Sequence, residues 1–201
     1  AVIGVEIGVN FMSVLLTNFV AETLWEIRTQ TDPSQSQTDI INQTEKYIAQ
    51  ALSIAKEEGL RPLGIGVGLP GLVNVRQGNL VIAPNLHWKD VPLRLIWNQR
   101  FHLPVYIDNE ANLSALGEYY FGIARNVDNF IYLSSDIGLG GGIVIDGKLF
   151  RGGHGFGGEI GHIQRDPSGE LCGCGRIGCW ETQVGPRAVL RRVKKEFETH
   201  H

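Results

Sequence analysis

Four residues of metal-ligand type lie close together in this chain: His162, Cys172, Cys174 and Cys179. Three thiolates and one imidazole form the closed tetrahedral set of a structural zinc site, because no position is left for a catalytic water. Glycines separate these residues, and glycine allows the backbone angles that a tight loop around an ion requires. The segment therefore predicts a structural Zn2+ site. The alternative is a glycine-rich loop with free buried thiols.

The glycine excess of the chain is concentrated in the same region, since 15 of the 26 glycines fall between Gly138 and Gly178. The cysteines are too closely spaced for a disulfide framework, which favours reduced thiols in a cytoplasmic protein. A net charge of −3 argues against a free-standing nucleic-acid-binding module, and a hydrophobic content of 43% argues against disorder. No apolar run approaches the length of a membrane span, so no membrane partner is expected.

Hydrophobic periodicity divides the chain into strands and helices. Strands are expected at 2–9, 12–17, 23–29, 63–68, 105–107, 130–134, 143–145 and 148–150. Helices are expected at 40–55, 91–101, 110–121 and 186–198, the first with Thr38 as its N-cap and Gly59 as its stop. A strand, a glycine bend and a second strand occur near Gly8 and again near Gly138. This repetition predicts a two-lobed α/β fold with a central cleft, with lobes at 1–108 and 109–201.

The candidate metal segment also carries a longer motif. Glu159-Ile-Gly-His162 is followed by Cys172-Gly-Cys174-Gly-Arg-Ile-Gly-Cys179-Trp-Glu181, which resembles the signature of the ROK family of repressors, open reading frames and kinases. The resemblance implies an actin-like, ribonuclease-H-like two-lobe fold that binds a sugar, here truncated at its C-terminus. Both ends of the chain look cut.

The resemblance also implies roles for individual residues. In ROK sugar kinases the residues matching Glu159, His162 and Glu181 bond sugar hydroxyls, and the histidine also binds zinc. The residue matching Asn109 bonds the sugar as well, the turn ending at Gly71 lies at the pocket wall, and Glu110 stands beside them at the position of the catalytic base. The alternatives are solvated surface carboxylates for Glu159 and Glu181 and a purely zinc-binding role for His162.

Three motifs depart from the kinase pattern. Glu110 replaces the aspartate that serves as base, and a displacement of about 1 Å at such a position costs on the order of a hundredfold in rate. The first phosphate loop reads Glu6-Ile-Gly8-Val-Asn instead of Asp-Ile-Gly-Gly-Thr. The second reads Asp136-Ile-Gly138-Leu-Gly140-Gly-Gly instead of Gly-Thr-Gly-Ile-Gly-Gly-Gly, which places a carboxylate where a triphosphate would bind.

These departures favour loss of phosphoryl transfer with retention of sugar binding. The chain is therefore expected to be the sugar-sensing domain of a ROK transcriptional regulator, a repressor of carbohydrate-metabolism genes that binds a monosaccharide or amino sugar. DNA would be bound only through a missing N-terminal winged helix-turn-helix, and the protein would be a homodimer or tetramer. The rival is an ATP-dependent, glucokinase-like enzyme that uses Glu110 as base; a zinc-stabilised interaction domain without a ligand is a third possibility. The basic residues of the last helix are expected to form a solvated face.

Overall fold

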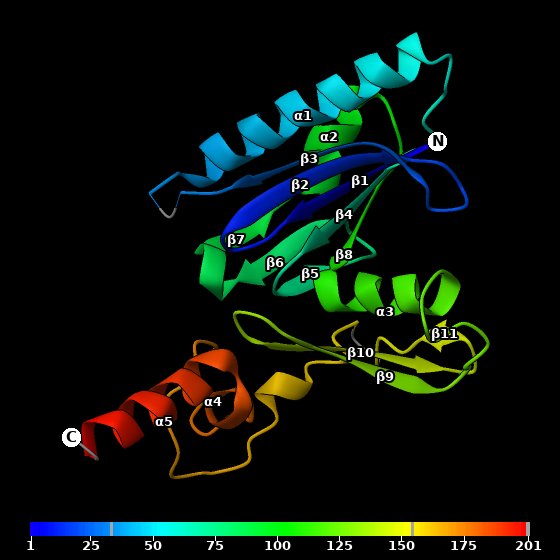
Figure 1. Cartoon of the computed structure of the whole chain (residues 1–201). Coiled ribbons are helices and arrows are strands. Elements are labelled where there is room, and N and C mark those ends of the chain that lie inside the picture. Colours follow the sequence, from blue (N-terminus) through cyan, green and yellow to red (C-terminus); the bar gives the residue numbers. More distant parts are fainter. Residues whose placement is uncertain (33, 154, 200–201) are drawn as a thin grey trace. The chain divides into compact units, whose positions relative to one another are not determined.

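The protein is described by a computed structural model of residues 1–32, 34–153 and 155–199 (Figure 1). It divides into two compact units, Ala1–Glu110 and Ala111–His201, each of which has its own sheet framework. No helix of the described part of the chain is both long enough and apolar enough to cross a membrane.

The first unit is built on a five-stranded sheet with the strand order β3-β2-β1-β4-β8. Its strands are β1 (Val2–Ile7), β2 (Phe11–Thr17), β3 (Thr23–Gln30), β4 (Ile65–Leu69) and β8 (Val105–Asn109). β1, β2 and β3 pair antiparallel, whereas β1, β4 and β8 pair parallel. The parallel strands therefore end at the same edge of the sheet, and the turns that follow them are brought together there.

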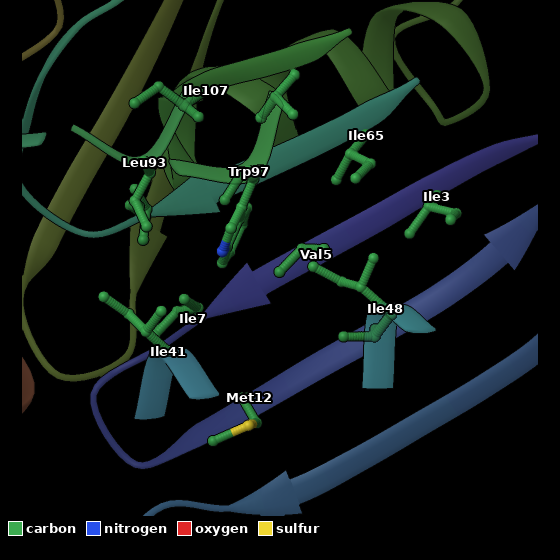
Figure 2. Close-up of a cluster of buried hydrophobic side chains, with 14 of the residues drawn as sticks. Ile3, Val5, Ile7, Met12, Ile41, Ile48, Ile65, Leu93, Trp97 and Ile107 are labelled. Carbon is green, nitrogen blue, oxygen red and sulfur yellow. The ribbon is translucent and has the colours of Figure 1, made fainter. Parts of the chain in front are cut away.

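One face of this sheet carries the core of the unit. Residues alternate between buried and half-buried along β1, so that Ile3, Val5 and Ile7 point to the same face. The helices α1 (Gln37–Glu57) and α2 (Leu93–Phe101) cover that face. Figure 2 shows their side chains, among them Ile48 and Trp97, directed toward the strands. The Trp97 indole nitrogen also donates to Glu45 Oε1 at 3.2 Å, which ties α2 to α1.

The beginning of α1 corrects a prediction from the sequence. Ser36, not Thr38, is the N-cap: its hydroxyl accepts from the Asp39 backbone N–H, and the Asp39 carboxylate accepts from the Ser36 backbone N–H. This reciprocal pair is a capping box, which satisfies two backbone donors at the helix start. Ser36 and Thr38 both have a hydroxyl that could cap the helix. Only Ser36 is followed three positions later by an acidic residue, Asp39, which completes the capping box.

A second, three-stranded sheet was not predicted from the sequence. It contains β5 (Leu72–Asn74), β6 (Asn79–Ala83) and β7 (Trp88–Val91), with the short 3-10 helix η1 (Pro84–Leu86) between the last two. Arg94 at the start of α2 holds this sheet to β8. Its guanidinium donates to the carbonyl oxygens of Val75, Arg76 and Val105 at 2.8–3.0 Å. The helix begins at Leu93 rather than at Val91, because Val91 belongs to β7.

The second unit contains a three-stranded antiparallel sheet and the helix α3. Its strands are β9 (Phe130–Ser135), β10 (Leu139–Ile145) and β11 (Lys148–Leu149), and α3 spans Glu110–Tyr120, with all but its first residue in this unit. α3 packs so closely on β10 that a Cβ at Gly142 would lie 2.6 Å from the Ala115 methyl carbon. The strand expected at 143–145 already begins at Leu139, so the glycine bend expected near Gly138 ends there and the later glycines belong to β10.

The remainder of the second unit is a long loop followed by helices. The loop contains the 3-10 helix η2 (Ile160–His162), and the helices are α4 (Glu181–Val184) and α5 (Pro186–Thr199). The basic side chains of α5 are exposed, as predicted, but Arg191 also forms an ion pair with Glu170 and donates to the Thr182 carbonyl oxygen. Arg191 therefore connects α5 to the loop rather than only facing solvent.

Candidate functional site

The parallel strands of the first unit place several predicted residues at one sheet edge. Glu6 on β1 is in register with Gly68 on β4, and Gly68 is in register with Asp108 on β8. Gly8 and Glu110 directly follow β1 and β8, and Gly71 lies two residues after the end of β4. The sheet thus explains why segments far apart in the sequence contribute to one group of candidate residues.

Asn109 and Gly71 contact each other at this edge. The Asn109 side-chain amide donates to the Gly71 carbonyl oxygen at 3.0 Å, and the Asn109 backbone N–H donates to Asp108 Oδ1 at 2.8 Å. Gly71 has a φ of 97°, and a Cβ there would lie 2.3 Å from the Ile82 carbonyl oxygen. The Asn109 amide is therefore held in a fixed orientation by a backbone turn that only glycine can form.

Hydrogen bonds within the first unit close the first glycine turn, which contains Gly8 and Asn10. The Gly8 backbone N–H donates to the Phe11 carbonyl oxygen at 2.9 Å. Thr31 bonds the turn from the other side, since its hydroxyl donates to the Val9 carbonyl oxygen and its N–H to the Asn10 carbonyl oxygen. Val9 and Asn10 are thus part of a compact hairpin turn between β1 and β2.

The second glycine turn, 136–138, connects β9 to β10 in the second unit. Asp136 is exposed on it, and Leu139 begins the strand that follows. The Leu139 backbone N–H donates to Glu181 Oε2 at 2.8 Å. Sequence reasoning missed this contact, because no local pattern connects residues 42 positions apart.

The four predicted metal ligands meet in the second unit. Ligand atoms of His162, Cys172, Cys174 and Cys179 all lie within 4.8 Å of one another. His162 Nδ1 is 3.5 Å from Cys172 Sγ, and Cys174 Sγ is 3.6 Å from Cys179 Sγ. This donor set fits a divalent cation that prefers sulfur and nitrogen, because three thiolates and an imidazole can surround it tetrahedrally.

The backbone around the cluster is closed by hydrogen bonds of the loop. The Cys172 N–H donates to the Arg176 carbonyl oxygen, and Leu171 and Ile177 form an isolated β-bridge. The Gly178 carbonyl oxygen accepts from the Arg165 and Asp166 N–H groups at 2.7 and 3.2 Å. These bonds bring the cysteine segment back toward η2, which carries His162.

Burial governs the ionisation of this cluster. Burial raises the pKa of the Cys172 thiol to about 12 and also raises the pKa of the Cys179 thiol. Without a cation these thiols are therefore protonated, and a bound cation would stabilise the thiolates instead and release protons.

Glu159 lies on the other side of His162. Its Oε2 is 4.0 Å from His162 Nε2, so that one ring nitrogen faces the cysteines and the other faces this carboxylate. Burial raises the pKa of Glu159, the His162 side chain opposes this shift, and the Glu181 carboxylate adds to it. A metal bound at Nδ1 would fix the ring and leave Nε2–H as a donor directed toward Glu159.

The predicted sugar ligands thus fall into two groups. Asn109, Gly71 and Glu110 belong to the first unit, and Glu159, His162 and Glu181 belong to the second. Within the second unit, Glu181 is also 3.6 Å from Cys172 Sγ through its Oε1. Carboxylates offer several acceptor positions for hydroxyl donors, so both groups have the chemistry of a polyol site.

Comparison with known proteins assigns the family. The family model described as ROK matches residues 2–201. The chain belongs to the ROK family. This result confirms the resemblance found in the cysteine motif, and the ROK membership covers both units.

Relatives within the ROK family include regulators and kinases. The chain is 43% identical to a xylose repressor of Caldicellulosiruptor bescii over 195 residues, which is 97% of this chain and 49% of the repressor. A solved ROK family transcriptional regulator, described as a homologue of the E. coli MLC protein, is 31% identical with a TM-score of 0.87, over 100% of this chain and 50% of that one. The chain therefore spans about half the length of these regulators.

A ROK glucokinase from Streptomyces griseus is similarly close in structure. It was solved in complex with glucose and AMPPNP, is 35% identical and has a TM-score of 0.86, over 98% of this chain and 61% of the kinase. The actin-like α/β fold of the ROK sugar kinases, expected from the sequence, is thus confirmed.

Proposed function

We propose that this chain is the sugar-sensing part of a ROK transcriptional regulator that represses carbohydrate-metabolism genes. The observation that carries the proposal is the 43% identity to a xylose repressor over nearly the whole chain. The altered phosphate-loop and base residues support it, because Val9, Asp136 and Glu110 each replace a residue that phosphoryl transfer uses.

The effector is proposed to be a monosaccharide or amino sugar, with D-xylose as the first candidate because of the relative's name. Its hydroxyls would donate hydrogen bonds to the carboxylates of Glu159 and Glu181. They would accept hydrogen bonds from the His162 ring and the Asn109 amide. Gly71 would shape the wall beside Asn109, and Glu110 would contact the sugar without acting as base. Sugar binding would favour one conformation of the protein over another and so change DNA binding by a part of the regulator outside these residues.

The metal cluster is proposed to hold a structural Zn2+ through His162, Cys172, Cys174 and Cys179. The donor set supports this, since it is complete without a water ligand. The ion would keep His162 in one ring orientation, and the protein's own residues would supply every contact to the sugar. Metal analysis should find about one zinc per chain, and less than half an equivalent would contradict the site.

Calorimetry of the zinc-loaded protein tests the sensor. D-xylose, D-glucose and N-acetylglucosamine should be titrated separately, and at least one should bind. Glu159→Gln should weaken binding by about 1.5–3 kcal/mol, as for a hydrogen bond to a charged group, and Asn109→Ala by about 0.5–1.5 kcal/mol, as for a neutral one. Glu170→Ala is the matched control, because this carboxylate pairs with Arg191 on α5. No binding by any sugar would refute the sensor.

An ATP-dependent sugar kinase is the second candidate, supported by the likeness to the Streptomyces griseus glucokinase. Glu110 would then take the proton from the attacking sugar hydroxyl while magnesium neutralises the phosphates. A coupled assay with ATP and sugar decides between the two. Phosphorylation that disappears in Glu110→Gln would establish the kinase.

Self-association as a dimer or tetramer, which is part of the regulator proposal, is tested by light scattering.

A further inference from the structure

The Glu181 carboxylate lies between the metal cluster and the second glycine turn. Its Oε2 accepts the Leu139 N–H at 2.8 Å, and its Oε1 is 3.6 Å from Cys172 Sγ. A single side chain therefore contacts both a candidate metal ligand and the first backbone donor after the turn.

The fit against the turn is close. A Cβ at Gly138 would lie 2.5 Å from Glu181 Oε2, so the carboxylate occupies the space that any side chain at this position would need. The hydrogen bond to Leu139 joins a charged acceptor to a buried backbone N–H, which is a strong type of protein hydrogen bond.

The metal-binding loop also packs on the same strand through η2. A Cβ at Gly161 would lie 2.0 Å from the Leu139 carbonyl oxygen, and Ile160 lies over Gly141. Leu139 is thus contacted by Glu181 of α4 at its backbone N–H and by η2 at its carbonyl side. Glu181 follows Cys179, one of the four cluster residues, by only two positions.

We propose that Glu181 is a positioning residue through which the metal-binding loop holds the 136–138 turn, so that the turn is ordered when the cluster is filled and loosens when the metal is removed. The inference rests on the proposed zinc site. It follows because metal-binding energy would order the segment that carries the four ligands, and Glu181, two residues after the last of them, supplies the acceptor for Leu139. Coupling of this kind is reciprocal, so a ligand that fixes the turn would also strengthen metal binding.

Amide hydrogen exchange at Leu139, followed by NMR on the 201-residue protein, tests the proposal. In the zinc-loaded protein Leu139 should exchange slowly, and chelation should accelerate it by about tenfold or more, as expected for loss of a charge-assisted hydrogen bond. In zinc-loaded Glu181→Ala, Leu139 should already exchange fast and chelation should add little. Glu181→Gln should restore most of the protection, because its amide oxygen can still accept the bond.

Glu170→Ala provides the matched control from the same loop, since it removes a carboxylate that faces α5 and should leave Leu139 unchanged. Zinc content is measured on each sample. Unchanged Leu139 exchange in zinc-loaded Glu181→Ala, or in the chelated wild type, would refute the proposal. Failure of both Glu181 variants, but not Glu170→Ala, to take up zinc would also refute it, because Glu181 would then serve the metal rather than the turn. A wild type that binds no zinc would be recognised by the metal analysis alone as failure of the zinc site.

Discussion

Two glycines of the metal-binding loop allow a quantitative test of the zinc site. Gly175 and Gly178 both have positive φ, at 87° and 70°. Alanine in this left-handed region costs about 1–2 kcal/mol, and that cost applies to both Gly175→Ala and Gly178→Ala. The surroundings differ, since a Cβ at Gly175 would meet nothing within 4 Å, whereas one at Gly178 would lie 1.5 Å from the Asp166 carbonyl oxygen.

Relief of the clash at Gly178 requires a backbone movement. An ordinary contact begins at 3.4 Å, so the two atoms must separate by 3.4 − 1.5 = 1.9 Å. This movement would break three backbone hydrogen bonds, two accepted by the Gly178 carbonyl oxygen and one donated by its N–H to Glu170. At about 1 kcal/mol each, these bonds bring the cost of Gly178→Ala to about 4–5 kcal/mol.

These costs should appear in zinc affinity, because in the proposed site the metal-binding energy would include the energy of folding the loop. With a factor of ten for each 1.4 kcal/mol, Gly175→Ala should weaken zinc binding by about tenfold and Gly178→Ala by about a thousandfold. Competition against a chromophoric chelator at fixed pH measures both values. Affinities of the two variants within threefold of each other would refute the argument from Cβ position.

Three further outcomes are expected. Ser36→Ala should lower the free energy of unfolding by about 1 kcal/mol at neutral pH, measured by urea denaturation. Hydrogen bonds from the Ser36 side chain and backbone lower the pKa of Asp39 below 3.8 in the folded protein. The contribution of Asp39 to stability is therefore present above pH 3.8 and is lost as the pH falls through the lower, folded-state pKa. A stability difference between Ser36→Ala and wild type that grows on acidification would contradict this sign. Arg94→Ala should lower the free energy of unfolding by about 2–3 kcal/mol, because three carbonyl oxygens lose their donor, and Arg94→Lys should restore only part of this loss. Equal stability of Arg94→Lys and wild type would disprove the role of the planar guanidinium group. Chelation should speed proteolysis within 163–185 while leaving the first unit resistant, and uniform cleavage of both units would count against a local metal loop.

Periodicity and motif spacing predicted the larger elements and the metal cluster. The apolar residues of α1 repeat at helical spacing, and the four metal-ligand residues lie near one another in sequence, so local information was sufficient. The three strands between Leu72 and Val91 are short and interrupted by turn residues, and they are stabilised by Arg94, which lies outside them.

The glycines of β10 show a different limit. Glycine is poorly suited to strands, so Gly140–Gly142 predicted a bend. The structure uses the missing side chains of Gly140 and Gly142 for close packing of α3, whose Ala111 and Ala115 lie against them. The need for glycine in β10 therefore comes from the packing of α3 against the strand. The sequence of β10 by itself does not reveal this need.

The parallel register of β1, β4 and β8 has a consequence for how function changes in such a chain over evolution. Main-chain pairing and the core on one face fix where each strand ends, so substitutions in the following turns leave the ladder intact. Val9, Asn10 and Glu110 occupy such positions and are absent from the buried core. The fold can therefore be kept while the residues that perform chemistry change. A few substitutions at the strand ends could convert an enzyme into a sensor, or the reverse, without loss of a stable fold.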